Sequence, residues 1–194
     1  MNFFSKTFAI AAISVAAIAS PASAGEAGPY VTANVGTGFN TETTGEVSGI
    51  DIEADSRITF MGGVGFGYDT GSNLRTEVGV SYGTADVDSV KVAGRNYDVD
   101  ESGDGWSVGT RIFYDFANDS DFTPFVGTGV ELNWSDSSVV YAIPVVAGVS
   151  YEATESVDVF GQLTYAMAPA QDVSGVDYDF NSAFSVQMGI RFSL

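Results

Sequence analysis

The sequence predicts an all-β fold, an eight-stranded antiparallel up-and-down β-barrel preceded by a cleaved signal peptide. Three observations lead to this prediction. Short runs alternate apolar residues with other residues, and the composition is rich in Gly, Phe and Tyr, with 23, 14 and 9 copies. The connections between the runs also alternate in length, as in a meander of strands.

The first 24 residues are typical of a secretory signal peptide. An apolar stretch from Phe8 to Ala19 follows one early cation, and small residues at Ala22 and Ala24 form a peptidase site. The stretch is too short for a membrane anchor, and no later segment approaches the roughly 20 apolar residues of a transmembrane helix. We therefore expect cleavage after residue 24, which leaves residues 25–194 as one β-barrel domain.

The charge and the missing residue types exclude several functions. Without Lys6, six cations remain against 25 acids, a net charge of −19, which argues against nucleic-acid binding. The chain has no Cys and no His, so Ser-His and Cys-His nucleophiles are excluded and a carboxylate pair is the remaining catalytic alternative. We expect no enzyme, no catalytic residues, no metal site and no cofactor.

Eight alternating runs have about the length of a tilted membrane-spanning strand. They cover residues 29–39, 57–68, 74–84, 105–116, 124–134, 139–151, 157–167 and 183–194. Pro144 falls inside the sixth run, where it removes a hydrogen bond of the ladder. Either a bulge lies there or this strand begins near Val145.

The connections fall into two groups at opposite ends of the predicted barrel. Apart from "SDSS", long connections lie at one end and short turns at the other. Bacterial outer-membrane barrels have this asymmetry, with long loops outside and short turns in the periplasm. The long loops carry most of the acids, which favours solubility, while weak binding of divalent cations at these loops stays open as an alternative.

In each run, the apolar residues point to one face and the residues between them point to the other. The residues between the apolar ones decide which face meets lipid. In a soluble barrel the apolar face lines the interior, whereas in a membrane barrel it faces outward around a polar lumen. Here the other parity holds small, ionic and amide side chains, including four of the five Arg residues. We assign it to the lumen, with a structural charge cluster of Arg57, Arg75, Glu77, Arg111, Asp115, Glu131, Asp158 and Arg191.

Aromatic residues on the apolar parity gather near both ends of the runs. Those near the long loops are Phe39, Tyr82, Trp106, Trp134, Tyr141, Tyr165 and Phe184. Those near the short turns are Tyr68, Tyr114, Phe116, Tyr151 and Phe192. Two aromatic belts around an aliphatic band are typical of a membrane with two interfaces, although aromatics also favour strand ends in other sheets. The residues expected to contact lipid between the belts include Val64, Val80, Ile112, Val130 and Met188.

Inward glycines are expected to leave room for long side chains, because an eight-stranded lumen holds little more than its own side chains. If the turn "DTGSN" closes around Gly71, a cross-strand register follows from the residue numbers. Each predicted pair sets an ionic side chain opposite a glycine: Gly67 with Arg75, Gly65 with Glu77, and Arg111 with Gly127 or Gly129.

Three segments resemble the small outer-membrane β-barrel superfamily, which includes OmpA- and OmpX-type barrels and surface-antigen-like proteins: "RIFYDFANDSDFTPFVGTGVELNW", "AGVSYEATESVDVFGQLTYAM" and "SVQMGIRFSL". The resemblance covers residues 28–194. It implies export to the outer membrane of a Gram-negative bacterium, contact with outer-membrane lipid and lipopolysaccharide, and assembly by the barrel assembly machinery. It also implies an assembly signal at Ile190, Phe192 and Leu194, where Leu194 departs from the usual terminal Phe or Tyr.

Together these observations predict a non-enzymatic barrel with a structural or surface-exposed role in the cell envelope. A narrow, porin-like channel for small solutes is the first alternative, favoured by the many inward glycines. An adhesin or receptor surface formed by the acidic outer loops is the second.

Overall fold

A computed structural model describes residues 27–47, 50–135, 138–173, 176–179 and 182–194, all as strands and their connections. The predicted signal peptide lies outside these residues. The described strands are β1 (Gly28–Gly38), β2 (Asn40–Val47), β3 (Ile50–Asp69), β4 (Leu74–Val92), β5 (Arg95–Asp115), β6 (Phe122–Ser135), β7 (Ser138–Thr154), β8 (Val157–Met167), β9 (Gln171–Val173), β10 (Val176–Asp179) and β11 (Ala183–Ser193). In the part of the chain that the structure describes, no helix is long and apolar enough to cross a membrane.

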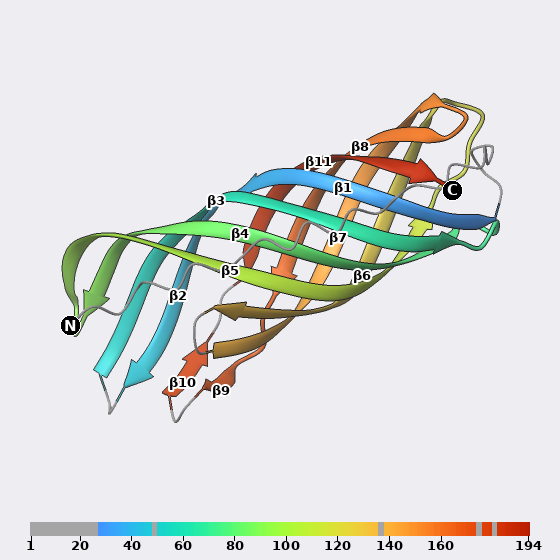
Figure 1. The fold of residues 1–194 in the computed structure, drawn as a ribbon. Coiled ribbons are helices and arrows are strands. Elements are labelled where there is room, and N and C mark those ends of the chain that lie inside the picture. Colours follow the sequence, from blue (N-terminus) through green and yellow to red (C-terminus); the bar gives the residue numbers. More distant parts are fainter. Residues whose placement is uncertain (1–26, 48–49, 136–137, 174–175, 180–181) are drawn as a thin grey trace.

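Eight of these strands form a closed antiparallel barrel (Figure 1). Around the ring the order is β1, β3, β4, β5, β6, β7, β8 and β11, and β1 closes it by pairing with both β3 and β11. The other three strands continue the sheet beyond the ring, since β2 pairs with β3, β10 with β2, and β9 with β10. The predicted eight-stranded, all-β fold is confirmed.

The two ends of the barrel differ as the connections predict. The turns β3–β4, β5–β6 and β7–β8 lie at one end, the short-turn end, together with the start of β1 and the end of β11 (Figure 1). The connections that include β2, β9 and β10, and the tip of the β4–β5 hairpin, lie at the opposite end, here called the long-connection end.

All three segments predicted as long loops contain strands, β2 and the start of β3 in the first, the ends of β4 and β5 in the second, and β9 and β10 in the third. β3 begins at Ile50, and β4 and β5 continue to a tight turn at Ala93 and Gly94, far beyond the predicted ends of these strands. Both turn residues have positive φ, 49° and 77°, which matches the type I′ turn that fits the twist of a hairpin. In these segments acidic residues alternate with apolar ones only in part, and such a pattern predicts loops. The prediction of loops was wrong for these segments.

Pro144 lies inside β7 without a bulge. Toward β6 the pairs Thr128–Val145 and Glu131–Ala142 share one register, and only the pairs between them are missing. The missing proline N–H therefore interrupts the ladder locally, so neither predicted alternative holds. Thr128 Oγ1 compensates in part, because it donates a hydrogen bond of 2.9 Å to the carbonyl oxygen of Pro144.

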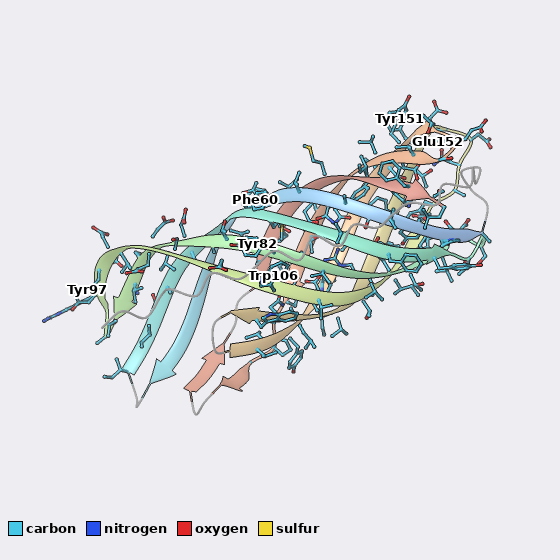
Figure 2. The ribbon with its side chains drawn as sticks, viewed as in Figure 1. Phe60, Tyr82, Tyr97, Trp106, Tyr151 and Glu152 are labelled. Carbon is cyan, nitrogen blue, oxygen red and sulfur yellow. The ribbon has the colours of Figure 1, made fainter. Side chains whose placement is uncertain are left out.

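Side chains of the two parities face opposite sides of the barrel wall. The apolar parity points outward, and Val64, Ile112, Val130 and Met188 are 46–67% exposed at the outer surface. The other parity points inward, where Phe113, Phe125 and Val146 form a small core with Phe160 packed against it. Figure 2 shows outward aromatic side chains along the barrel, with Tyr82 and Trp106 toward the long-connection end and Tyr151 at the short-turn end.

Candidate functional site in the barrel lumen

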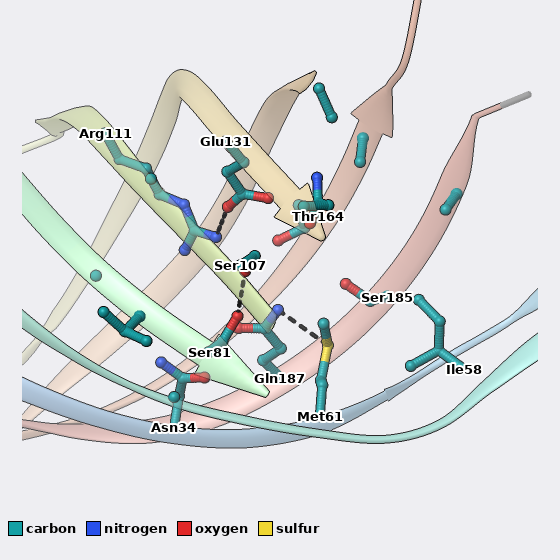
Figure 3. Close-up of a pocket in the computed structure, with 18 of the residues that line it drawn as sticks. Asn34, Ile58, Met61, Ser81, Ser107, Arg111, Glu131, Thr164, Ser185 and Gln187 are labelled. Atoms are coloured by element: carbon teal, nitrogen blue, oxygen red, sulfur yellow. Dashed lines mark hydrogen bonds and ion pairs between the residues drawn. The ribbon is translucent and has the colours of Figure 1, made fainter. Parts of the chain in front are cut away.

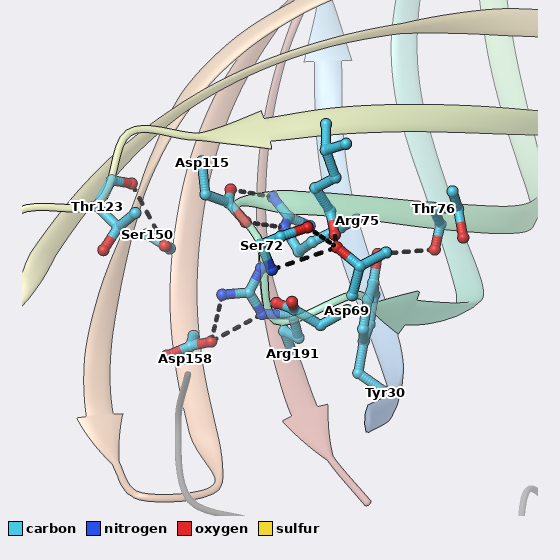
Figure 4. A network of polar contacts seen from close by, with 12 residues as sticks. Tyr30, Asp69, Ser72, Arg75, Thr76, Asp115, Thr123, Ser150, Asp158 and Arg191 are labelled. Atoms are coloured by element: carbon cyan, nitrogen blue, oxygen red, sulfur yellow. Dashed lines mark hydrogen bonds and ion pairs between the residues drawn. The ribbon is translucent and has the colours of Figure 1, made fainter. Parts of the chain in front are cut away.

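An arginine closes the lumen near the short-turn end. Arg75 projects inward from β4 and its guanidinium forms two parallel hydrogen bonds with Asp115 of β5, Nε to Oδ2 at 2.6 Å and Nη2 to Oδ1 at 2.9 Å (Figure 4). Its side chain is only 5% exposed. Such bidentate, charge-assisted pairs combine strength with a fixed geometry, so the position of Arg75 is well determined.

Three aromatic rings surround this guanidinium. The Arg75 Cζ atom lies 4.6 Å from the centroid of the Phe113 ring, 5.2 Å from that of Phe125 and 5.8 Å from that of Tyr30. Phe113 and Phe125 meet edge to face at 5.8 Å and 84°, a favourable aromatic geometry. We call these five residues, Tyr30, Arg75, Phe113, Asp115 and Phe125, the lumenal plug.

A second ion pair extends the plug across the seam of the barrel. Arg191 Nε of β11 donates to Asp158 Oδ2 of β8 at 2.7 Å, and the Arg191 Cζ atom lies 5.7 Å from the ring centroid of Tyr30. The Tyr30 hydroxyl in turn donates to the Thr76 carbonyl oxygen at 3.2 Å. Side chains from six of the eight barrel strands therefore meet at this level and fill the lumen.

Each inward aromatic ring lies against a glycine of the neighbouring strand. The cross-strand pairs are Tyr30 with Gly67, Phe113 with Gly127, Phe125 with Gly148, and Phe160 with Gly189. A Cβ atom on any of these glycines would lie only 2.1–2.5 Å from a ring atom of its partner. The rings fit in so narrow a lumen only because the opposite residue has no side chain.

The predicted glycine partners were correct for one arginine and wrong for the other ionic residues. Arg111 does face Gly129. The β3–β4 register is shifted by two residues from the predicted one, because the turn spans residues 70–73 with left-handed backbone at Gly71 and Asn73. Arg75 therefore lies between Asp69 and the bulky Phe113, and Glu77 lies opposite Gly67.

Above the plug, toward the long-connection end, the lumen holds a cavity of about 250 Å³ (Figure 3). Glu77, Arg111 and Glu131 are the charged residues at its lining, and Arg111 Nη2 pairs with Glu131 Oε1. Glu77 accepts a hydrogen bond of 3.2 Å from Thr32 Oγ1. Hydroxyl and amide groups line the walls, including Asn34, Ser81, Ser107, Thr164, Ser185 and Gln187.

Comparison with known proteins identifies the family of this barrel. The family described as "Outer membrane protein beta-barrel domain" matches residues 8–194. The chain belongs to this family. A comparison with curated proteins finds no match.

Two solved outer-membrane barrels are similar to the chain. Neisserial surface protein A (NspA) is 20% identical, with a TM-score of 0.58 over 89% of this chain and 99% of the other. OprG from Pseudomonas aeruginosa is 14% identical, with a TM-score of 0.57 over 87% of this chain and 98% of the other. At such low identity, the similarity to these two structures supports the fold of the chain and carries no information about its function.

The structure arranges the predicted lumenal charges as separate pairs, two at the level of the plug and one at the cavity above it. Three pairs form, Arg75 with Asp115, Arg191 with Asp158, and Arg111 with Glu131, whereas Glu77 has the hydroxyl of Thr32 as its partner. The side chain of the eighth predicted residue, Arg57, lies outside the described part. The structural role of the eight predicted charged residues stays a prediction.

Sequence reasoning missed the aromatic part of the plug. The predicted aromatic belts lie on the outward parity, whereas Tyr30, Phe125 and Phe160 lie on the inward parity. The same alternation that places Arg75 inward also places these rings inward, so the signal was present in the sequence.

The twelve aromatics predicted as belts all lie on the outward parity. Neighbouring strands bring several of them together, with ring centroids 5.2 Å apart for Tyr82 and Trp106 and 4.5 Å apart for Tyr165 and Phe184. Their contact with membrane interfaces stays a prediction.

At the end of the chain, Leu194 N donates to the Pro29 carbonyl oxygen at 3.0 Å, and the assembly signal that includes Leu194 also stays a prediction.

Proposed function

We propose that the protein is a non-conducting, non-enzymatic barrel in the outer membrane of a Gram-negative bacterium, exported through its signal peptide, with a structural or surface-exposed role in the envelope. Outer-membrane lipid and lipopolysaccharide are its proposed surroundings, and the barrel assembly machinery its proposed partner during biogenesis. The observation that carries the proposal is the lumenal plug.

The plug opposes the passage of solutes because its central charge is held on several sides. Opening would have to separate the Arg75 guanidinium from Asp115 and from three aromatic rings at once. Breaking a buried ion pair costs about 3–5 kcal/mol, which limits an open state to a fraction between about 10⁻² and 10⁻⁴. A barrel that rarely opens suits a structural or surface role better than transport.

Planar-bilayer recording on refolded protein tests the absence of conduction. We expect no single-channel currents from the wild type. The double substitution Arg75→Ala with Phe113→Ala removes the centre of the plug and is expected to produce currents. Lys91→Ala, in the exposed hairpin beyond the barrel, is the matched control and is expected to stay silent. Steady wild-type currents of the same size as those of the double variant would refute the proposal.

A narrow channel is the second candidate, and the cavity above the plug favours it. The lumen is already open over about 250 Å³, so only the plug separates this space from the short-turn end. If the protein is a channel, brief wild-type openings should become longer in Asp115→Asn, because that change weakens the hold on Arg75. Identical silence of both proteins would exclude this candidate.

A further inference from the structure

We propose that the cavity above the plug binds a small organic cation, a protonated primary amine, with Glu77 as its counter-ion. This inference concerns the cavity alone and does not depend on whether the plug conducts. It rests on the charge of the cavity, on an unsatisfied hydroxyl in its wall, and on the mixture of polar and apolar groups around it (Figure 3).

The charged side chains that line the cavity, Glu77, Glu131 and Arg111, sum to one negative charge. Arg111 is engaged by Glu131. Glu77 lies directly across from Arg111 in the β4–β5 pair, but among the described residues no cationic side chain comes within ion-pair distance of its carboxylate, and Thr32 provides a single hydroxyl donor. Glu77 is half-buried, and a partly desolvated carboxylate without a positive partner is unfavourable, so the cavity favours a ligand that brings one.

The wall opposite Glu77 carries an unsatisfied polar group. Thr164 on β8 is 5% exposed, and its Oγ1 atom has no hydrogen-bond partner in the described part of the chain. Because β4 and β8 are four strands apart in the ring of eight, Glu77 and Thr164 approach the same cavity from opposite walls. Buried hydroxyls are normally satisfied, so this one indicates room for a ligand with a second polar group.

The remaining lining favours an amine over a metal ion or an anion. The described residues contain no group of three or more acidic side chains that could hold a metal, and hard cations need several such oxygens. An anion would have to displace Glu131 from Arg111. Ile58, Met61 and Ala142 offer apolar contact to a short carbon chain, while an ammonium group supplies three N–H donors for the oxygens around it.

Isothermal titration of refolded, detergent-solubilised protein with 4-amino-1-butanol tests this site. The neutral 1,4-butanediol and the anionic 4-hydroxybutyrate have similar carbon chains and serve as ligand controls. We expect saturable binding of the amine alone. Glu77→Gln, which keeps the shape and removes the charge, is expected to weaken binding at least tenfold. Glu53→Gln, a charge change in the exposed hairpin, is the matched control and is expected to leave affinity unchanged.

Thr164→Val keeps the inference testable should Glu77→Gln fail to refold. Its hydroxyl has no partner in the described part, so the change is expected to preserve stability while it weakens binding of 4-amino-1-butanol about threefold. Binding of n-butylamine, which lacks the second polar group, is expected to stay the same. Lack of amine binding to the wild type, equal binding of the diol or the anion, or full affinity in either variant would overturn the inference. Conductance measurements do not enter this test, so its failure is distinct from failure of the proposed plug.

Discussion

Substitution of Gly127 by Ala tests the packing of rings against glycines. The added Cβ atom would lie 2.4 Å from Phe113 Cδ1, 2.8 Å from its Cε1 and 3.0 Å from the Ile112 carbonyl oxygen. The ring cannot simply move away, because it packs edge to face on Phe125 and under the guanidinium of Arg75. Overpacking of this kind costs about 1–3 kcal/mol, and loss of a desolvated cation–π contact adds about 1–2 kcal/mol.

We therefore expect Gly127→Ala to lower the free energy of unfolding by about 2–5 kcal/mol. Urea titration of the barrel in lipid vesicles, followed by the fluorescence of Trp106 and Trp134, measures this change. Gly161→Ala is the matched control, since a Cβ there meets nothing within 4 Å on the outer face of β8. It is expected to be neutral or slightly stabilising, because Gly is unfavourable within a strand. Equal stability of the two variants would refute the packing argument.

Three further predictions address the outer face, the plug and catalysis. Val130→Arg places a charge in the middle of the outward face and is expected to cost about 2–4 kcal/mol in bilayers relative to Val130→Ala, so unchanged unfolding would show that this face does not meet lipid. Asp115→Asn leaves Arg75 buried without its counter-ion and is expected to cost about 3–5 kcal/mol. Glu53→Gln in the exposed pair is expected to cost less than about 1 kcal/mol, and urea titration compares the two. Incubation with labelled lipid A and phospholipids is expected to give no turnover, and hydrolysis that co-purifies with the protein would contradict this.

The barrel itself was predictable because one physical rule governs each strand. A closed wall with lipid outside and side chains inside forces strict alternation, and the sequence of β11 follows that rule without interruption from Phe184 to Phe192. The same rule placed Arg75, Arg111 and Arg191 inward. The predicted strand boundaries were correct within a few residues wherever the two faces of a strand differ in polarity, as in β8.

The rule gives no information where both faces of a strand meet water. The distal parts of β4 and β5 alternate poorly, since residues such as Asp86, Asp88 and Asp98 are tolerated on either face, and the sequence was interpreted as loop. Ladder hydrogen bonds and the Ala93–Gly94 turn hold this hairpin together instead, and neither has a periodic signature.

Partners across strands were predicted correctly for β5 and β6 but not for β3 and β4. A turn longer by one residue shifts every pair in a hairpin, and Asn73 adopts a left-handed conformation that the sequence did not indicate. As a result, Gly65 and Gly67 could be assigned to the lumen but not to their partners on β4, whereas Arg111 does face Gly129. The aromatic–glycine pairs and the cavity around Glu77 became visible only with the register.

The pairing of β1 with β11 has a consequence for the kinetics of folding. Tyr30 lies opposite Ser193, 163 positions later in the chain, so the ring closes by pairing its first strand with its last. Pairings of such long range form slowly, because loop closure comes before any stabilising contact. The plug spans this same seam, since Arg191 of the last strand lies over Tyr30 of the first. Until closure, Tyr30 lacks the Arg191 guanidinium beside its ring, so this one contact reports closure of the ring rather than the early formation of hairpins.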